Sequence, residues 1–99
     1  MTYAYVANNG ANTVSKIDLS TFTTVGSALA VGSSPFVIAI DPTGTYAYTA
    51  NNSDNTVSKI DLSTFTTVGS ALAVGTGPYS IAITPTPKTN SNFFAFMGA

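Results

Sequence analysis

The chain consists almost entirely of one segment that occurs twice. Residues 3–45 align without gaps on residues 46–88, at a period of 43 residues, and 33 of the 43 aligned positions are identical. The stretch 12–32 recurs unchanged as 55–75. Self-similarity at a period of about 20 to 50 residues is typical of folds in which each unit buries its faces only against copies of itself. Two units are too few to complete such a fold, so the duplication predicts assembly with further copies.

Composition excludes several classes of function. Charged residues make up 7% of the 99 residues and hydrophobic residues 44%, against a usual charged share of about 25%. The sequence has no cysteine, histidine or glutamate, so disulfides, thiolate sites and Ser-His-Asp arrangements are all excluded. We therefore expect no catalytic residues, no cofactor and no metal site.

Neither nucleic acid nor a membrane is expected as a partner, whereas a small-molecule or protein ligand stays unknown. The cationic side chains are Lys16, Lys59 and Lys88, and arginine is absent, so no basic groove for a nucleic acid is predicted. No apolar run approaches the roughly 20 residues that span a bilayer, and the N-terminus lacks the pattern of a secretion signal. Nucleic acid and membrane are therefore excluded as expected partners.

Each repeat reads as four short strands separated by turns. Alternating or continuous apolar patterns, rich in Thr, Val, Tyr and Ile, predict strands in the first repeat at 2–8, 13–19, 24–31 and 36–40. Residues 41–44, Asp-Pro-Thr-Gly, predict a type I turn before the cycle restarts. Four strands in about 40 to 45 residues is the size of one blade of a β-propeller. The expected fold class is all-β, with two four-stranded antiparallel propeller blades per chain.

Four motifs carry a resemblance to a known family. They are YVAN at 5–8, NTVSKID at 12–18, VGSSP at 31–35 and IAIDPTG at 38–44. In this order they resemble the YVTN type of β-propeller repeat of microbial surface-layer proteins, and the resemblance covers both repeats, 3–88. It implies a disc of blades, typically seven, in proteins that are often extracellular or at the cell surface.

Lys16 and Lys59 depart from this family, whose members often carry an apolar residue there. Two interpretations remain open for these lysines. Either the stem packs while the ammonium reaches solvent, or the ammonium pairs with Asp18 or Asp61 two residues further on.

The phase of the repeat predicts an open edge. If residues 36–40 form the innermost strand of a blade, the chain holds one complete blade, 36–74, preceded by three strands of another. Residues 79–83 are then a spare innermost strand that completes the open blade of a neighbouring molecule. The predicted subunit interface comprises Tyr3, Tyr5, Val6, Tyr79, Ile81 and Ile83. Repetition of this contact predicts a cyclic trimer or tetramer, with six or eight blades.

Two segments fall outside this core prediction. Residues 1–88 form the repeat region, and 89–99 are a non-repeat tail in which 93–96 looks like a degenerate strand. The tail either competes for the edge of 79–83, or folds over the ring surface or remains mobile.

In related propellers, ligands usually bind at the connections after the second and fourth strands of each blade, so the resemblance implies a candidate ligand face there. It comprises Asn8, Asn9, Asn12, Asn51, Asn52, Asp54, Asn55, Ser33, Ser34 and Thr76. Such a crown would suit a sugar, a peptide or a cation, but hairpins also need Asn and Gly for their turns alone. Calcium needs 6 to 8 oxygen ligands, and Asp54 is the one carboxylate here. Asp41 is expected to be structural, within its turn.

Two classes of function survive. The first is a non-catalytic, self-assembling propeller scaffold or binding module, either a piece of a surface propeller or an engineered repeat protein, with no specific ligand inferable. The alternative is a hydrolase or lactonase with a site shared between subunits, because a fold alone does not exclude chemistry.

Overall fold

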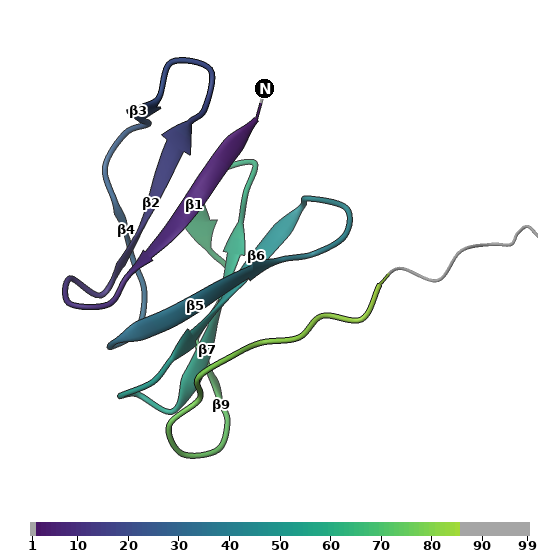
Figure 1. Ribbon diagram of the computed structural model, residues 1–99. Coiled ribbons are helices and arrows are strands. Elements are labelled where there is room, and N and C mark those ends of the chain that lie inside the picture. Colours follow the sequence, from purple (N-terminus) through teal and green to yellow (C-terminus); the bar gives the residue numbers. More distant parts are fainter. Residues whose placement is uncertain (1, 86–99) are drawn as a thin grey trace, which may run out of the picture.

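The computed structural model describes residues 2–85, which form two antiparallel sheets and no helix (Figure 1). The first sheet contains β1 (Tyr3–Asn8), β2 (Thr13–Asp18), β3 (Thr23–Thr24) and β4 (Leu29–Ala30). The second contains β5 (Pro35–Ile40), β6 (Tyr46–Asn51), β7 (Thr56–Asp61), β8 (Thr66–Thr67) and β9 (Leu72–Ala73). The all-β prediction is confirmed for this part of the chain. The strand predicted at 93–96 lies outside the described residues.

The two repeats form their hairpins in the same register. β1 pairs with β2 from Tyr3 opposite Asp18 to Asn8 opposite Thr13. β6 pairs with β7 in the register obtained by adding 43 to each of these numbers. We call two residues 43 positions apart repeat mates. Because local sequence and register are shared, any difference between mates reflects what surrounds them.

The prediction of one third strand over residues 24–31 is wrong. The structure has two short strands in its place, β3 and β4, which pair with opposite ends of β2. Between them the chain turns out of the sheet at Gly26, whose φ is +65°. Glycine adopts this left-handed conformation without steric cost, and a residue in it cannot continue an extended strand. The mate Gly69 has the same φ and separates β8 from β9.

The turn predicted at residues 41–44 is present. The Gly44 N–H donates to the Asp41 carbonyl at 3.0 Å, and the Asp41 carboxylate accepts the Thr45 N–H at 2.9 Å. Gly44 has a φ of +74°. The turn joins β5 directly to β6, so the second sheet starts with the strand expected to be innermost.

The two sheets differ at this starting edge. The second sheet runs β5-β6-β7-β8, whereas the first begins with β1 and has, within residues 2–85, no strand in the place of β5. The mates of β5 are residues 78–83, which follow the second sheet and form no strand in the described chain. Figure 1 shows this segment leaving the β9 end of the second sheet as an extended stretch. The expected phase, with an incomplete first blade, is therefore what the structure contains.

The hydrophobic core lies between the two sheets. Its buried members are Val14, Ala47, Ile60 and Leu62. Partly buried side chains packed around them are Tyr5, Leu29, Val31, Ile38 and Phe65. Both sheets contribute, so each sheet is stabilised by its contact with the other. Within residues 2–85, no helix has the length and apolar character needed to cross a membrane.

Candidate functional site

The most distinctive surface of the molecule is the open edge of β1. In β6, the side chains of Ala47, Thr49, Ala50 and Asn51 are all 0% exposed. Their mates in β1 are Ala4, Val6, Ala7 and Asn8, of which Val6 is 41% exposed and the others are half-buried. The two strands share sequence pattern and hairpin register, so the difference reflects their surroundings: β5 borders β6 and Ala47 of β6 lies in the core between the sheets, whereas no strand of residues 2–85 borders β1 on the corresponding side. β1 is an edge strand that is less covered than the corresponding strand β6.

The predicted interface residues occupy two separate places. Tyr3, Tyr5 and Val6 lie on β1, as expected. Tyr5 turns out to pack within the chain, with its ring centroid 5.9 Å from that of Phe65. Burial, and then the charge of the neighbouring Tyr3, raise the pKa of Tyr5 above its ordinary value. Tyr5 therefore belongs to the core between the sheets.

The other predicted interface residues lie on the segment after the second sheet. Tyr79 is 68% exposed, and its ring centroid lies 4.9 Å from that of its mate Phe36. Ile81 and Ile83 line an open hollow of about 370 Å³ beside Tyr48. Within one chain these residues do not pair with β1. The segment is extended and presents apolar side chains without a bonded strand neighbour.

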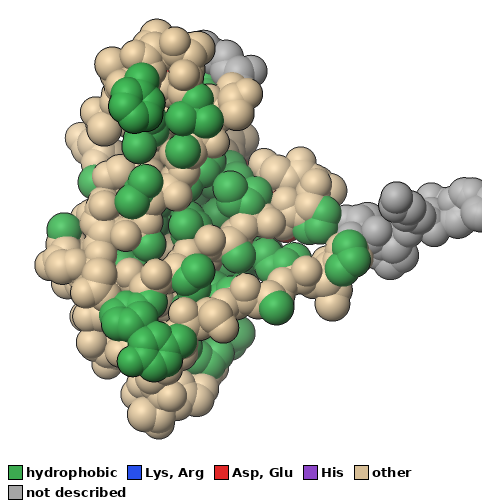
Figure 2. All heavy atoms as spheres, viewed as in Figure 1, with side chains coloured by type: hydrophobic (Ala, Val, Ile, Leu, Met, Phe, Trp, Pro, Cys, Tyr) green, Lys and Arg blue, Asp and Glu red, His purple; other side chains and the backbone are tan. Residues whose placement is uncertain are grey.

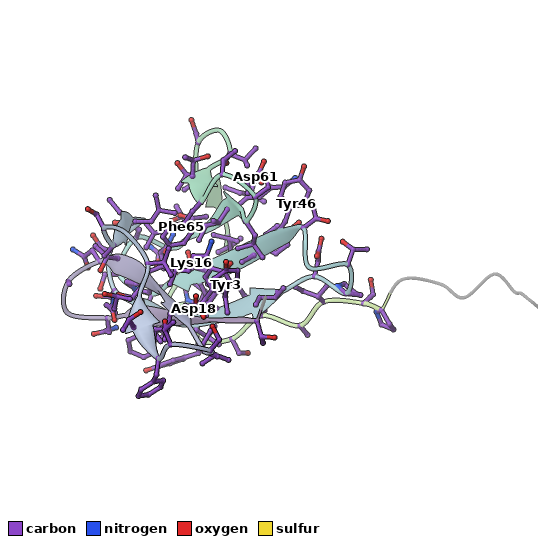
Figure 3. The ribbon with its side chains drawn as sticks, turned by 90° about the horizontal axis from the view of Figure 1, so that it is seen from above. Tyr3, Lys16, Asp18, Tyr46, Asp61 and Phe65 are labelled. Carbon is purple, nitrogen blue, oxygen red and sulfur yellow. The ribbon has the colours of Figure 1, made fainter. Side chains whose placement is uncertain are left out.

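Both lysines on the strands lie against tyrosine rings. The Lys16 Nζ is 4.2 Å from the centre of the Tyr3 ring, and the Lys59 Nζ is 4.2 Å from that of Tyr46. Figure 3 shows Lys16 next to Tyr3 and, separately, Tyr46. An ammonium over an aromatic face is attracted to its negative quadrupole. Neither interpretation from the sequence included this contact, although the diagonal position of Tyr3 and Lys16 across the β1–β2 hairpin is a signal that could have found it.

Asp18 and Asp61 serve the turns that follow their strands. Each carboxylate accepts the hydroxyl and the backbone N–H of the serine two residues on, at 2.7 and 2.9 Å. The serine hydroxyl, followed by the serine N–H, lowers the pKa of each carboxyl below its ordinary value. In Asp41, partial desolvation raises the pKa, but the hydrogen bonds from Thr45 and other turn groups outweigh it and the net shift is downward. These carboxylates are structural.

The asparagines of the candidate ligand face are largely engaged inside the protein. Asn51 is fully buried, and its Nδ2 donates to Thr56 Oγ1 at 3.1 Å and Ser58 Oγ at 2.9 Å. Thr49 Oγ1 donates to the Asn51 Oδ1 at 3.0 Å. Asn8 makes the two mate bonds, to Thr13 and Ser15. The mate of Thr49 is Val6, which has no hydroxyl to complete the network.

Asn12 and Asn55 fasten the link that leaves each sheet. Both adopt the left-handed conformation, with φ of 61° and 58°, which asparagine tolerates better than most residues. The Asn12 Oδ1 accepts the Ser34 N–H at 2.9 Å, and the Asn55 Oδ1 accepts the Gly77 N–H at 2.8 Å. The two residues therefore have a demonstrated role in the turns.

The remaining polar residues hold the linker between β4 and β5 to the β6–β7 turn. Asp54 Oδ2 accepts the Ser33 N–H at 2.8 Å, and Ser53 Oγ donates to Ser34 Oγ at 2.9 Å. Asn52 donates from its backbone to Ser34 and from its side chain to the Pro78 carbonyl. The Asp54 carboxylate, the one considered for calcium, holds a backbone N–H.

The structure thus brings most of the predicted ligand-face residues together at one end of the sheets. Asn9 and Thr76 are exposed, while most of the others bond to the chain itself. Among residues 2–85, no group of three or more His, Cys, Asp or Glu side chains is placed to hold a metal ion. Ligand binding at this face remains a prediction.

Comparison with known proteins supports the fold at a coarse level. No family model matches the sequence, and no curated protein matches it. Among solved structures, the chain is similar to the hydrazine synthase of Kuenenia stuttgartiensis, a protein that contains β-propeller domains, with a TM-score of 0.74 and 25% sequence identity. The match covers 78% of this chain and 21% of that one, so the chain spans about a fifth of the enzyme's length. The two antiparallel sheets are therefore propeller-like in shape and arrangement.

Proposed function

We propose that this chain is a non-catalytic building block that assembles with copies of itself into a β-propeller, as a scaffold or binding module. The observation that carries the proposal is the burial contrast between β1 and β6. Val6 is 41% exposed where its mate Thr49 is 0% exposed, in hairpins of the same register. A neighbouring chain that supplied a strand along β1 would give it the edge neighbour that β5 gives to β6.

Residues 78–83 of the neighbour are the strand that fits. They are the mates of β5, which covers β6 with Ile38 opposite Thr49 and Ile40 opposite Ala47. The mate of Ile38 is Ile81 and the mate of Thr49 is Val6. The same pairing between chains therefore places Ile81 of one copy opposite Val6 of the next. Addition of an extended segment to a free edge satisfies the backbone groups of both partners.

The surface of β1 does little to prevent such pairing. Proteins protect free edges with charged side chains, proline or bulges. β1, with the sequence YAYVAN, contains no charged residue and no proline, and its register with β2 is unbroken. Residues 78–83 of the donor are likewise uncharged, with Pro78 at the first position.

Repeated donation generates a ring. Each copy gives one strand and accepts another, so the contact is head-to-tail and closes when the rotation allows it. With two sheets per chain, three copies form a ring of six sheets and four copies a ring of eight. Both are compatible with the proposal.

A proline in the donated strand tests the proposal. Ile81→Pro removes a backbone donor and disfavours a central strand, so sedimentation velocity should show loss of the assembled species, whereas Ile81→Val should assemble like the parent protein. Since residues 78–83 form no strand within the described chain, far-UV circular dichroism of the variant should retain the sheet signal. Assembly of Ile81→Pro at parental strength would overturn the proposed strand donation.

The non-catalytic part of the proposal has its own test. The similar structure belongs to an enzyme, and no contact among residues 2–85 favours a particular reaction. A panel of lactones and esters, combined with metal analysis of the purified protein, should show neither turnover above background nor stoichiometric metal. Turnover that copurifies with the assembled particle would favour the hydrolase alternative.

A further inference from the structure

The exposed hydrophobic side chains of this molecule fall into two groups when they are compared with their repeat mates. Figure 2 shows such side chains spread over one face of the molecule. Val25 and Val68 are mates and are exposed to similar extents, 37% and 40%. A second group consists of exposed residues whose mates lie in or against the core between the sheets: Leu19, Phe22, Leu72 and Val74. This second group needs an explanation, because sequence alone does not make these positions exposed.

The covered mates all belong to the core between the two sheets. Phe22 is 79% exposed, but Phe65 is packed against the core; Leu19 is 44% exposed, but Leu62 is 9% exposed. Leu72 and Val74 are 68% and 41% exposed. Their mates, Leu29 and Val31, also pack against the core.

These residues divide between the two sides of the internal contact. The first sheet contributes Leu29 and Val31, and the Tyr5 ring, to its contact with the second sheet. The second sheet contributes Leu62 and Phe65. After a shift of one repeat, the second sheet carries Leu72, Val74 and Tyr48 on its outer side, and the first sheet of another copy carries Leu19 and Phe22.

We infer that a second copy docks its first sheet against the second sheet of this chain and forms a replica of the internal core, in which Phe22 of one copy packs on Tyr48 of the other. Leu19 and Phe22 would meet Leu72 and Val74, as Leu62 and Phe65 meet Leu29 and Val31. This inference rests on the proposed self-assembly and adds to it a face, an orientation and a set of contacting residues. Strand donation alone specifies none of these, because donated strands can also link sheets that do not touch.

Phe22 already has the left-handed backbone conformation of its packed mate. Its φ is +55°, and that of the packed mate Phe65 is +53°. The hydroxyl pairs that flank the two rings, Thr21 with Thr23 and Thr64 with Thr66, have the same separation of 2.7 Å. A left-handed phenylalanine is uncommon, and the same backbone is present with and without a partner. The loop therefore presents a preorganised anchor, and less ordering is needed on association.

One and the same neighbouring copy accepts the donated strand and docks its first sheet. The copy that receives residues 78–83 along its β1 presents its Phe22 to the copy that donates them, because both relations follow from one shift of 43 residues. In the donor, Tyr48 lines the open hollow together with Ile81 and Ile83. The docking face and the donated strand are therefore adjacent on the donor.

Cross-linking between single-cysteine chains tests the predicted contact. The sequence has no cysteine, so Phe22→Cys and Tyr48→Cys each introduce one thiol. Mixed, exchanged and treated with a short bismaleimide, the two variants should give a covalent dimer, and neither variant alone should give one. An assembled particle in which the mixture gives no such dimer would overturn the docking inference and leave strand donation intact. A parent chain that stays monomeric would contradict both.

Alanine substitutions provide a second readout with a matched control. Phe22→Ala should raise the concentration for half-assembly by about tenfold or more, since buried aromatic anchors dominate interfaces, while the thermal unfolding of the dilute chain should stay unchanged. Val25→Ala removes an exposed side chain whose mate is equally exposed, and should leave assembly within about twofold of the parent. Equal effects of the two substitutions on assembly would overturn the inference.

Discussion

Asn51 links β6 to β7 through side-chain hydrogen bonds, and its burial depends on what packs around β6. Its side chain is buried, and both ends of its amide are hydrogen-bonded: the oxygen accepts from Thr49, and the nitrogen donates to Thr56 and Ser58. Asn8 occupies the same place in β1 but is half-buried. The pair therefore separates the effect of burial from that of side-chain chemistry.

Asn51→Ala should destabilise the chain more than Asn8→Ala. Loss of a buried amide leaves the hydroxyls of Thr49 and Ser58 with unmet hydrogen bonds, a cost of about 1–3 kcal/mol. At Asn8, water can replace the amide in the dilute chain, so the cost should be less than about 1 kcal/mol. Urea denaturation of the two variants below the concentration of assembly measures the difference. Equal losses would contradict the burial contrast between β1 and β6.

The turn carboxylates predict how stability depends on pH. The pKa values of Asp18 and Asp61 are lowered in the folded chain by the serine hydroxyl and N–H they accept. Their contribution is therefore present above the unfolded pKa of about 4 and is lost as pH falls through the lower folded value. The thermal midpoint should fall between pH 5 and pH 2, about one unit above and two below that unfolded pKa.

The control for this prediction is the double variant Asp18→Asn/Asp61→Asn. Asparagine keeps an oxygen that accepts the serine N–H but does not titrate. The variant should show a smaller fall in thermal midpoint over the same pH range. A parental slope in the double variant would assign the pH dependence to other groups.

Strands and turns could be predicted from the sequence, whereas the contacts between side chains could not. The strands β1, β2 and β5 and the turn at 41–44 were predicted because alternation and turn chemistry act within a few residues. The third strand was misassigned because Gly26 in a β-rich pattern is compatible with a continuous strand, and only its positive φ divides β3 from β4. The contact of Lys16 with Tyr3 depends on a diagonal across the hairpin, which a reading along the chain does not show.

The candidate site could be predicted only in part. The open edge was foreseeable, because it follows from the phase of the repeat. The internal engagement of Asp54 and Asn55 was not, since both contacts span about twenty residues and depend on how the linkers fold back. The exposure of Phe22 was also not predicted, because it stands out only when it is compared with the packing of Phe65 against the core.

At the scale of elements, two glycines test whether the junction between sheets repeats between chains. A Cβ built at Gly32 would lie 2.6 Å from Asn51 Nδ2 and 2.8 Å from Asp54 Oδ2, whereas one at Gly75 would meet no atom within 4 Å. Gly32→Ala should therefore destabilise the dilute chain by about 1–3 kcal/mol through overpacking. Gly75→Ala should leave the dilute chain within about 0.5 kcal/mol of the parent.

In the assembled protein, Gly75→Ala should be destabilising, although it is expected to be neutral in the dilute chain. If a second copy docks as the second sheet docks on the first, the added methyl group would meet Asn8 of that copy, the mate of Asn51. Sedimentation should then show weaker assembly of Gly75→Ala despite unchanged stability of the single chain. Parental assembly of this variant would show that the junction between chains differs from the junction within the chain.

At the scale of the whole molecule, the two kinds of junction cannot be identical. Within the chain, Asp54 holds the Ser33 N–H and Ser53 bonds to Ser34. The mates of Asp54 and Ser53 are Ala11 and Gly10, which lack these polar groups. A ring would thus alternate clamped junctions within chains with less polar junctions between them. The number of sheets in the ring depends on the angle between sheets at both kinds of junction. For this reason the sequence predicts a closed ring but allows either six or eight sheets.

The mass of the native particle tests the central claim most directly, because every other inference depends on the chain being incomplete alone. Size-exclusion chromatography with multi-angle light scattering should give a single species at three or four times the chain mass of 10.1 kDa, that is about 30 or 40 kDa for a ring of closed point-group symmetry. A monodisperse particle of one chain mass, at concentrations where the fold is intact, would contradict the account.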